Sequence, residues 1–146
     1  MLKKVTATVF NNWLRFVSCA VFIISLTQKS FCTEGSCGDG IACLISGAIG
    51  FATGGAALTW LANPLLFLSW ILIHKNPKLS LQISIAATLI ALSFLFFKQI
   101  MADEAGNYSR IISYKFGYWL WVSSSVIMFV GNLVSKYFIM TKVVTL

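Results

Sequence analysis

The chain has 146 residues, of which 58% are hydrophobic and 10% charged, and its formal net charge is +7. A soluble domain carries about 25% charged residues, so this chain could not cover a surface that faces water, which excludes a soluble enzyme. The basic residues stand at the ends of apolar runs. This is typical of topology signals beside lipid headgroups and excludes a nucleic-acid-binding surface.

Four apolar segments alternate with short polar segments. A membrane-spanning helix needs about 20 apolar residues, and four such helices use nearly the whole length. The pattern predicts an all-α, polytopic membrane protein, a bundle of four transmembrane helices with short loops, in a single domain over 1–146. The predicted spans are approximately 9–26, 41–73, 79–98 and 118–140, and the predicted outer loops are 27–40 and 101–117.

The segment Ile41–Ile73 contains no charged residue and dominates the chain. As one helix it would be about 50 Å long, against a hydrocarbon core of roughly 30 Å. Either it tilts and projects from the membrane, or it breaks near Gly54-Gly55. We expect one long, tilted helix.

The distribution of basic residues predicts the orientation. Four spans put both termini on one side of the membrane, with seven basic residues and no acid. The other side has four basic residues, and the positive-inside rule counts only Lys and Arg. Both termini are therefore expected in the cytoplasm. The seven residues on that side are Lys3, Lys4, Arg15, Lys75, Lys78, Lys136 and Lys142.

Two cysteines in the first outer loop, Cys32 and Cys37, predict a disulfide, because a compartment outside the cytoplasm is oxidising and Gly35 permits a tight closure. Cys43 is the alternative partner. Quinone-linked disulfide-generating membrane enzymes resemble this chain only in the number of spans. Their first loop carries a CxxC instead of the CxxxxC found here, so a thiol oxidoreductase is a distant alternative.

Small residues recur every four positions at Ser46, Gly50 and Gly54, and the last two form a GxxxG pattern. On a helix they make a narrow ridge that lets two backbones approach closely. The ridge could pack against another helix of the same chain or against a second copy.

The pair Asn63-Pro64 interrupts the apolar segment. Pro64 is expected to kink the helix, and Asn63 brings a polar amide near the middle of the membrane, where it needs a partner. The amide could make a hydrogen bond to a neighbouring helix, or mark a hinge or polar binding point. Expected partners are Thr59, Ser93, the serines at 123–125, and Asn132.

No Asp or Glu lies within a predicted span, so a small proton-coupled efflux pump with a membrane-embedded carboxylate is not expected. We assign no catalytic residue, no cofactor and no metal site. The second outer loop carries the candidate recognition residues Asp103, Glu104, Asn107 and Arg110.

The strings TEGSCGDG, WLANPLLFLSW, DEAGNYSRI and GYWLW together resemble a group of small four-span bacterial inner-membrane proteins that has no assigned function. The resemblance covers most of the chain. It implies a bacterial inner-membrane location and carries no site residue.

These features favour a non-enzymatic membrane helix bundle that acts through protein–protein interaction, as an accessory or immunity-like component. Its expected partners are the lipid bilayer and either another membrane protein or a second copy of the chain. The alternative is a small oligomeric channel or transporter subunit with a polar point at Asn63 and Pro64.

Overall fold

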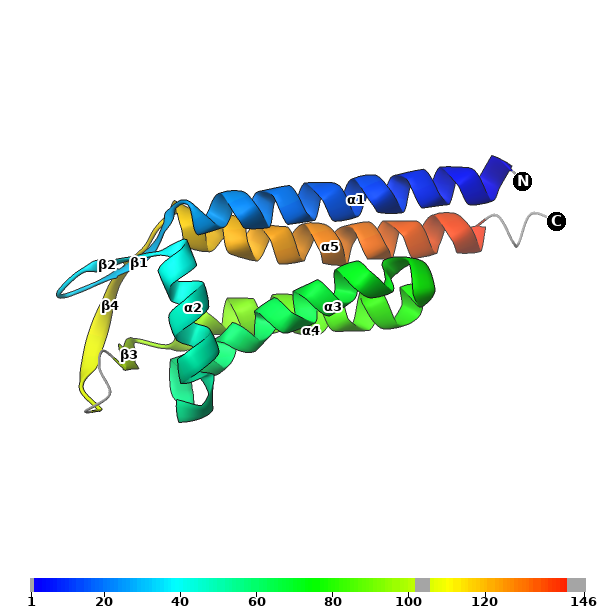
Figure 1. The fold of residues 1–146 in the computed structure, drawn as a ribbon. Coiled ribbons are helices and arrows are strands. Elements are labelled where there is room, and N and C mark those ends of the chain that lie inside the picture. The colour runs from blue at the N-terminus through cyan, green and yellow to red at the C-terminus, as the bar shows by residue number, and fades with distance from the viewer. Residues whose placement is uncertain (1, 102–105, 142–146) are drawn as a thin grey trace.

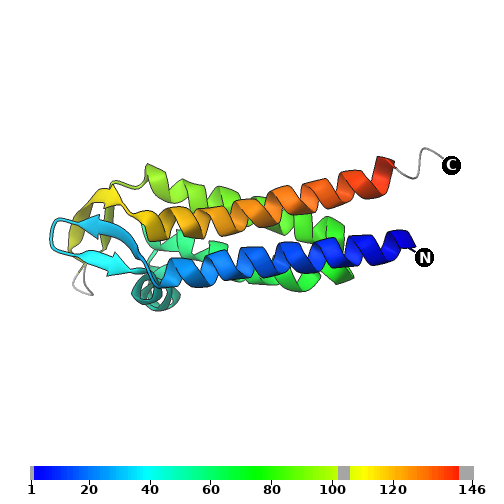
Figure 2. The ribbon, with the colours of Figure 1, turned by 90° about the horizontal axis from the view of Figure 1, so that it is seen from above.

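The chain folds into a bundle of long helices with a small β-sheet at one end (Figure 1). A computed structural model describes the backbone of residues 2–101 and 106–141 and the side chains of residues 8–101 and 106–137. The bundle consists of α1 (Leu2–Leu26), α3 (Ala62–Lys75), α4 (Pro77–Ser93) and α5 (Phe116–Thr141). α1 lies along α5, and the α3–α4 hairpin packs against this pair (Figure 2). The predicted helical bundle is confirmed as the main part of the fold.

Four helical stretches are long and apolar enough to cross a membrane: Thr8–Leu26, Gly55–Lys75, Pro77–Phe96 and Phe116–Tyr137. Each overlaps one of the four predicted spans. The start of α1, the end of α5 and the α3–α4 turn lie at one end of the bundle, and the sheet lies at the other end (Figure 1).

The all-α prediction is wrong at the sheet end. There β1 (Lys29–Thr33), β2 (Cys37–Asp39), β3 (Gln99–Met101) and β4 (Tyr108–Tyr114) form one antiparallel sheet in the order β2-β1-β4-β3. The two segments predicted to be loops are joined because β1 pairs with β4. The strands are short, and the central pairing joins segments that lie far apart in the chain. The preference of such strands depends on their partners more than on their own residues.

The expected continuous helix over Ile41–Ile73 is also wrong. The segment forms α2 (Gly40–Gly50), the 3₁₀ helices η1 (Phe51–Thr53) and η2 (Gly55–Leu61), and then α3. Gly54 and Gly55 have φ angles of +83° and +60°, in the left-handed region that glycine adopts without a Cβ clash. The chain therefore leaves the helix at the alternative break point, and α2 crosses the end of the bundle (Figure 1).

This break disrupts the predicted ridge of Ser46, Gly50 and Gly54, because Gly54 lies outside α2. A Cβ atom built on Gly50 or Gly54 meets nothing within 4 Å. Gly47 makes the close contact instead, since its Cβ would lie 2.5 Å from Cδ1 of Trp60. At Gly50 and Gly54 no neighbouring atom comes close enough to require a glycine, whereas at Gly47 the Trp60 side chain does.

The interior of the bundle is rich in hydrogen-bonded polar side chains. Ser18 joins three helices: its Oγ accepts from Nε1 of Trp70 at 2.9 Å and donates to the carbonyl oxygen of Ser124 at 2.8 Å. The Ser69 and Ser80 hydroxyls donate to each other's carbonyl oxygens at 3.0 and 2.9 Å. Such bonds hold helices together where apolar burial provides no preference for one packing over another.

Ser125 breaks this pattern and gives a first prediction. Its Oγ is fully buried and has no hydrogen-bond partner within the described part of the chain. An unpaired buried hydroxyl costs about 1–3 kcal/mol, so Ser125→Ala is expected to raise the free energy of unfolding by ~1 kcal/mol. The measurement is unfolding of the detergent-solubilised protein by SDS titration, followed by circular dichroism.

The matched control is Ser124→Ala, because Ser124 is equally buried but donates to the carbonyl oxygen of Trp121 at 2.7 Å. Both substitutions gain the same helix propensity, so only Ser125→Ala should stabilise beyond that shared gain. Equal effects of the two substitutions would contradict an unpaired hydroxyl at Ser125.

Candidate functional site

The hairpin of β1 and β2 carries the predicted disulfide. Cys32 and Cys37 stand directly opposite each other in the strand pair, and their sulfur atoms are bonded. The turn is closed by a hydrogen bond from the Thr33 amide to the carbonyl oxygen of Ser36 at 2.8 Å. The prediction of a Cys32–Cys37 bond is confirmed, and Cys43 has a free thiol.

The disulfide gives a second prediction. Replacing both Cys32 and Cys37 with serine is expected to lower the free energy of unfolding by ~2 kcal/mol, because the unfolded chain loses a short covalent loop. Thermal unfolding in detergent, with and without dithiothreitol, measures the effect. The reductant should lower the melting temperature of the wild type and of the Cys19→Ser control, but not of the double variant. A wild type that ignores the reductant would contradict a stabilising role.

The free thiol of Cys43 lies close to the hairpin, since a Cβ built on Gly38 would come within 2.8 Å of its Sγ. Burial raises the pKa of the Cys43 thiol; the charge of Asp39 adds to this, and a hydrogen bond with Ser30 opposes it. A raised pKa lowers the thiolate fraction at neutral pH, and thiolate is the form that attacks a disulfide. The raised pKa therefore disfavours thiol exchange at Cys43.

The outward face of β4 is the most distinctive surface of the sheet. Side chains alternate along a strand, and Tyr108, Arg110 and Ile112 are exposed while the intervening residues are partly buried. Tyr108 is 59% and Ile112 63% exposed, which is unusual for large side chains on an ordered strand. We call these three residues the β4 row.

The other side of the sheet packs onto the bundle, and the register shift between β1 and β4, between Ile111 and Ser113, interrupts the alternation so that Tyr114 as well as Ile111 packs there. Phe31 from β1 contacts Phe94 with ring centroids 5.3 Å apart, and Tyr114 from β4 contacts Phe94 at 5.8 Å and Tyr118 at 5.0 Å. Ile111 joins the same cluster. This packing and the pairing of β4 with both β1 and β3 fix the strand that carries the β4 row.

Two of the four predicted recognition residues belong to this region. Arg110 lies in the β4 row, and Asn107 is exposed and directly precedes β4. Asp103 and Glu104 lie outside the described residues. Tyr108 and Ile112 were missed by the sequence analysis, although the alternation in Tyr108–Tyr114 could have indicated a half-buried strand.

Asn63 is buried, and both polar atoms of its side chain make a hydrogen bond. Its Oδ1 accepts a hydrogen bond from Nε1 of Trp121 at 2.7 Å, and its Nδ2 donates to the carbonyl oxygen of Trp60 at 3.0 Å. The bond to α5 agrees with the predicted contact between helices, but the partner is a tryptophan and none of the expected hydroxyl or amide groups.

The kink expected at Pro64 stays a prediction. Pro64 is the third residue of α3, where a backbone N–H would have no partner within the helix. The change from 3₁₀ to α geometry occurs just before it, between Leu61 and Ala62. Trp60 lies four residues before Pro64, and its carbonyl oxygen accepts from Asn63 Nδ2 in place of the N–H that proline lacks.

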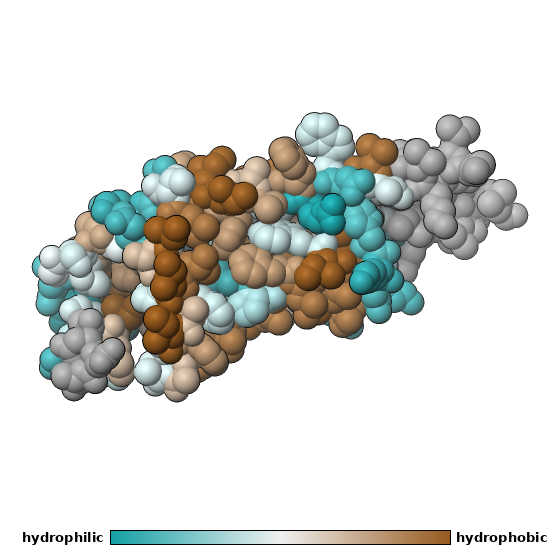
Figure 3. All heavy atoms as spheres, in the orientation of Figure 1, coloured by the Kyte–Doolittle hydropathy of each residue, from teal (hydrophilic) through white to brown (hydrophobic). Residues whose placement is uncertain are grey.

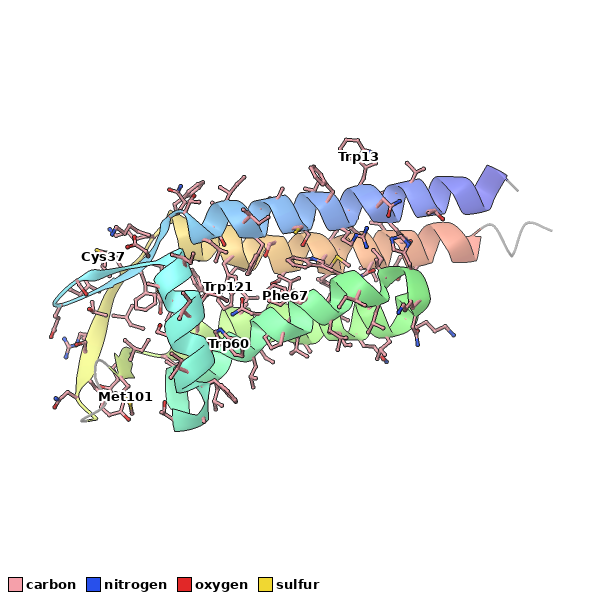
Figure 4. The ribbon with its side chains drawn as sticks, viewed as in Figure 1. Trp13, Cys37, Trp60, Phe67, Met101 and Trp121 are labelled. Carbon is pink, nitrogen blue, oxygen red and sulfur yellow. A yellow bond between two sulfur atoms is a disulfide. The ribbon has the colours of Figure 1, made fainter. Side chains whose placement is uncertain are left out.

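A cavity of about 650 Å³ lies between α2, η2, the sheet and the end of the bundle. Trp60 from η2, Trp121 from α5 and Met101 from β3 line it from different sides (Figure 4). Cys43 lies in the α2 wall, and none of the described residues that line the cavity is charged. The Nε1 atoms of both tryptophans are engaged, that of Trp60 with the carbonyl oxygen of Leu44 at 2.8 Å.

No family model matches this chain, and no curated protein and no solved structure is similar to it. Within the described residues, no group of three or more His, Cys, Asp or Glu side chains is placed to hold a metal ion. The arrangement offers two features suited to binding: the exposed β4 row on a rigid sheet and the uncharged cavity beneath α2.

Proposed function

We propose that this chain is a non-enzymatic integral membrane protein that binds another protein, as an accessory or immunity-like component. The observation that carries the proposal is the β4 row, an exposed Tyr, Arg and Ile on an inner strand of a disulfide-bonded sheet. The row extends the predicted recognition segment from Arg110 to its two neighbours on the same face.

The polarity of the bundle supports a place in the bilayer. Its interior holds hydrogen-bonded serines and asparagines, whereas Trp13 and Phe16 on α1 are 64% and 66% exposed, and Leu89 on α4 is 62% exposed. In water this arrangement would leave a large apolar surface uncovered. In lipid the apolar side chains are solvated by hydrocarbon, and small polar residues between helices provide the packing.

The charge distribution supports an orientation in a bacterial inner membrane. Lys75 and Lys78 lie at the α3–α4 turn, at the end of the bundle opposite the sheet. The positive-inside rule favours a cytoplasmic location for this end and for both termini. The sheet would then face the oxidising side, where a Cys32–Cys37 disulfide persists.

The chemistry of the β4 row suits a protein partner. Tyr and Arg are enriched among the residues that dominate binding energy at interfaces, and a rigid strand loses little entropy on binding. Arg110 can donate two parallel hydrogen bonds to a carboxylate of the partner, while Tyr108 and Ile112 offer apolar contact on either side.

The bonding of Asn63 favours this proposal over the oligomeric pore. A pore-lining amide would face water, but Asn63 is buried, and its side-chain oxygen and nitrogen each make a hydrogen bond within the same chain, to Trp121 and Trp60. The fully buried hydroxyls of Ser69 and Ser80 likewise make hydrogen bonds to each other's residue. We therefore propose no channel activity.

Site-specific photo-crosslinking tests the proposal. A benzophenone amino acid at Tyr108 or Ile112, in cells of a bacterial host that carries the partner, is expected to give a discrete adduct whose yield falls several-fold in the Arg110→Ala background. The control is the same amino acid at Leu89, which is equally exposed but lies on a bundle helix. Adducts shared by all three positions, or adducts indifferent to Arg110, would overturn the proposal. Two differently tagged copies distinguish a second chain from another protein.

A further inference from the structure

The cavity beneath α2 is separate from the β4 row and has its own chemistry. α2 is apolar on both faces: Ile41, Ile45 and Ile49 point outward, and Cys43, Leu44 and Gly47 line the cavity. A row of hydrophobic residues covers the outer side of α2 (Figure 3). Ile49 is 80% exposed and also borders the cavity, so the cavity rim continues into the outer apolar surface.

The polar groups around the cavity are already used within the protein. The indole N–H groups of Trp60 and Trp121 donate to Leu44 and Asn63, and the Tyr118 hydroxyl donates to the carbonyl oxygen of Ala91 at 3.1 Å. The hydroxyls that helices contribute to the wall make hydrogen bonds within their own helices, as Thr59 does with the carbonyl oxygen of Ala56 at 2.7 Å, and Ser30 of β1 makes a hydrogen bond with Cys43.

The hydrogen bonds of these polar groups determine which class of ligand the cavity can bind. A polar or charged group that entered the cavity would lose its water and find neither an opposite charge nor a free side-chain donor among these groups, which is costly. A hydrocarbon chain has no hydrogen bonds to water to lose, and it gains contact with Trp60, Trp121 and Phe31. The volume falls within the range of about 300–1,000 Å³ that is usual for ligand sites.

We propose that the cavity binds an acyl chain of a membrane phospholipid, which enters beside α2 and leaves its headgroup outside. The inference rests on the membrane location proposed above. Since Phe31, Ile100 and Met101 of the sheet also line the cavity, the bound chain would fill the space between α2 and the sheet. A mainly apolar cavity that opens to the surface favours hydrocarbon as its occupant, so a surrounding bilayer is the natural source of that occupant.

The test uses a phosphatidylcholine with a diazirine in its acyl chain, in liposomes that contain the full chain. After irradiation, labelled peptides are expected from α2 and η2 at cavity positions, and also from the outer side of α1 around Phe16. Two variants fill the cavity: Gly50→Leu, where a Cβ meets no atom within 4 Å, and Ala57→Leu in η2. Each is expected to reduce cavity labelling several-fold and to leave labelling at Phe16 unchanged.

The matched control is Ala48→Leu, since Ala48 is exposed on α2 and does not line the cavity. This variant should be labelled like the wild type. Loss of resistance to added protease identifies any variant that fails to fold. Labelling around Phe16 without labelling in the cavity, in the wild type, overturns this inference and leaves the membrane proposal intact. Labelling at neither place overturns both. Cavity labelling by a diazirine fatty acid but not by the phospholipid overturns the phospholipid as the source of the chain.

Discussion

Gly40→Ala is expected to lower the free energy of unfolding by about 1–3 kcal/mol, the usual cost of overpacking a tight contact. Gly40 is the buried first residue of α2, and its amide donates to the carbonyl oxygen of Gln28 at 2.8 Å. A Cβ on it would strike the carbonyl oxygen of Ser25 and lie 2.8 Å from Cα of Leu26. These are backbone atoms, so no side-chain rotation can relieve the contact.

The contact holds α2 against the end of α1. A second glycine packs closely against the turn that joins α1 to β1. A Cβ on Gly117, at the start of α5, would lie 2.7 Å from the carbonyl oxygen of Lys29 and 2.9 Å from that of Gln28. The turn between α1 and β1 is therefore clamped by two glycines at positions where any side chain would collide with backbone. Gly117→Ala is expected to have the same sign and size of effect as Gly40→Ala.

The control for both is Gly50→Ala. Gly50 is also in α2, has right-handed φ and ψ angles of −87° and −5°, and has open space at the Cβ position. Alanine should be neutral or stabilise by about 0.5–1 kcal/mol, because glycine is the poorer helix former. SDS titration followed by circular dichroism compares the variants. If Gly40→Ala were as stable as Gly50→Ala, the backbone of the turn could move away at little cost, and the two glycines would not hold it in place.

The sequence predicts those parts of the fold that depend on local composition. The four long apolar segments and the Cys32–Cys37 bond follow from hydropathy and from spacing, and both agree with the structure. The break in Ile41–Ile73 was visible as an alternative, since two adjacent glycines make a left-handed turn inexpensive. Hydropathy alone favoured the wrong choice there, because α2 is as apolar as the helices of the bundle.

The rest depends on contacts between segments that are distant in the sequence. Three α-helices and three 3₁₀ helices separate β1 from its partner β4 in the sequence, and Lys29–Thr33 carries no strong strand signal of its own. The partner of Asn63 was sought among small polar residues, but the indole of Trp121 reaches it from α5. The cavity likewise arises where α2, η2 and the sheet meet, and no single segment contains its pattern.

The hydrogen bond between Asn63 and Trp121 gives the second large expected effect. Asn63→Leu has nearly the same size but removes the acceptor of Trp121 Nε1 and the donor to the carbonyl oxygen of Trp60. The latter group cannot recover a helical N–H, because residue 64 is proline. Nε1 of Trp121 is left unpaired, and the carbonyl oxygen of Trp60 keeps only the backbone N–H of Ala62, so the expected loss in free energy of unfolding is about 1–3 kcal/mol.

A double-mutant cycle separates this bond from the packing around it. Trp121→Phe removes the donor and leaves the Asn63 Oδ1 unpaired, so each single substitution carries a penalty that the double variant Asn63→Leu/Trp121→Phe partly avoids. The double variant is expected to be more stable than additivity predicts by about 1–2 kcal/mol, within the usual range for residues in contact. The control cycle pairs Asn63→Leu with Trp119→Phe, because Trp119 is half-exposed and has no bond to Asn63; it should be additive. Additivity in the Trp121 cycle as well would mean that the bond contributes nothing, and the Asn63 Oδ1 would then be an acceptor of the kind that a polar binding point requires.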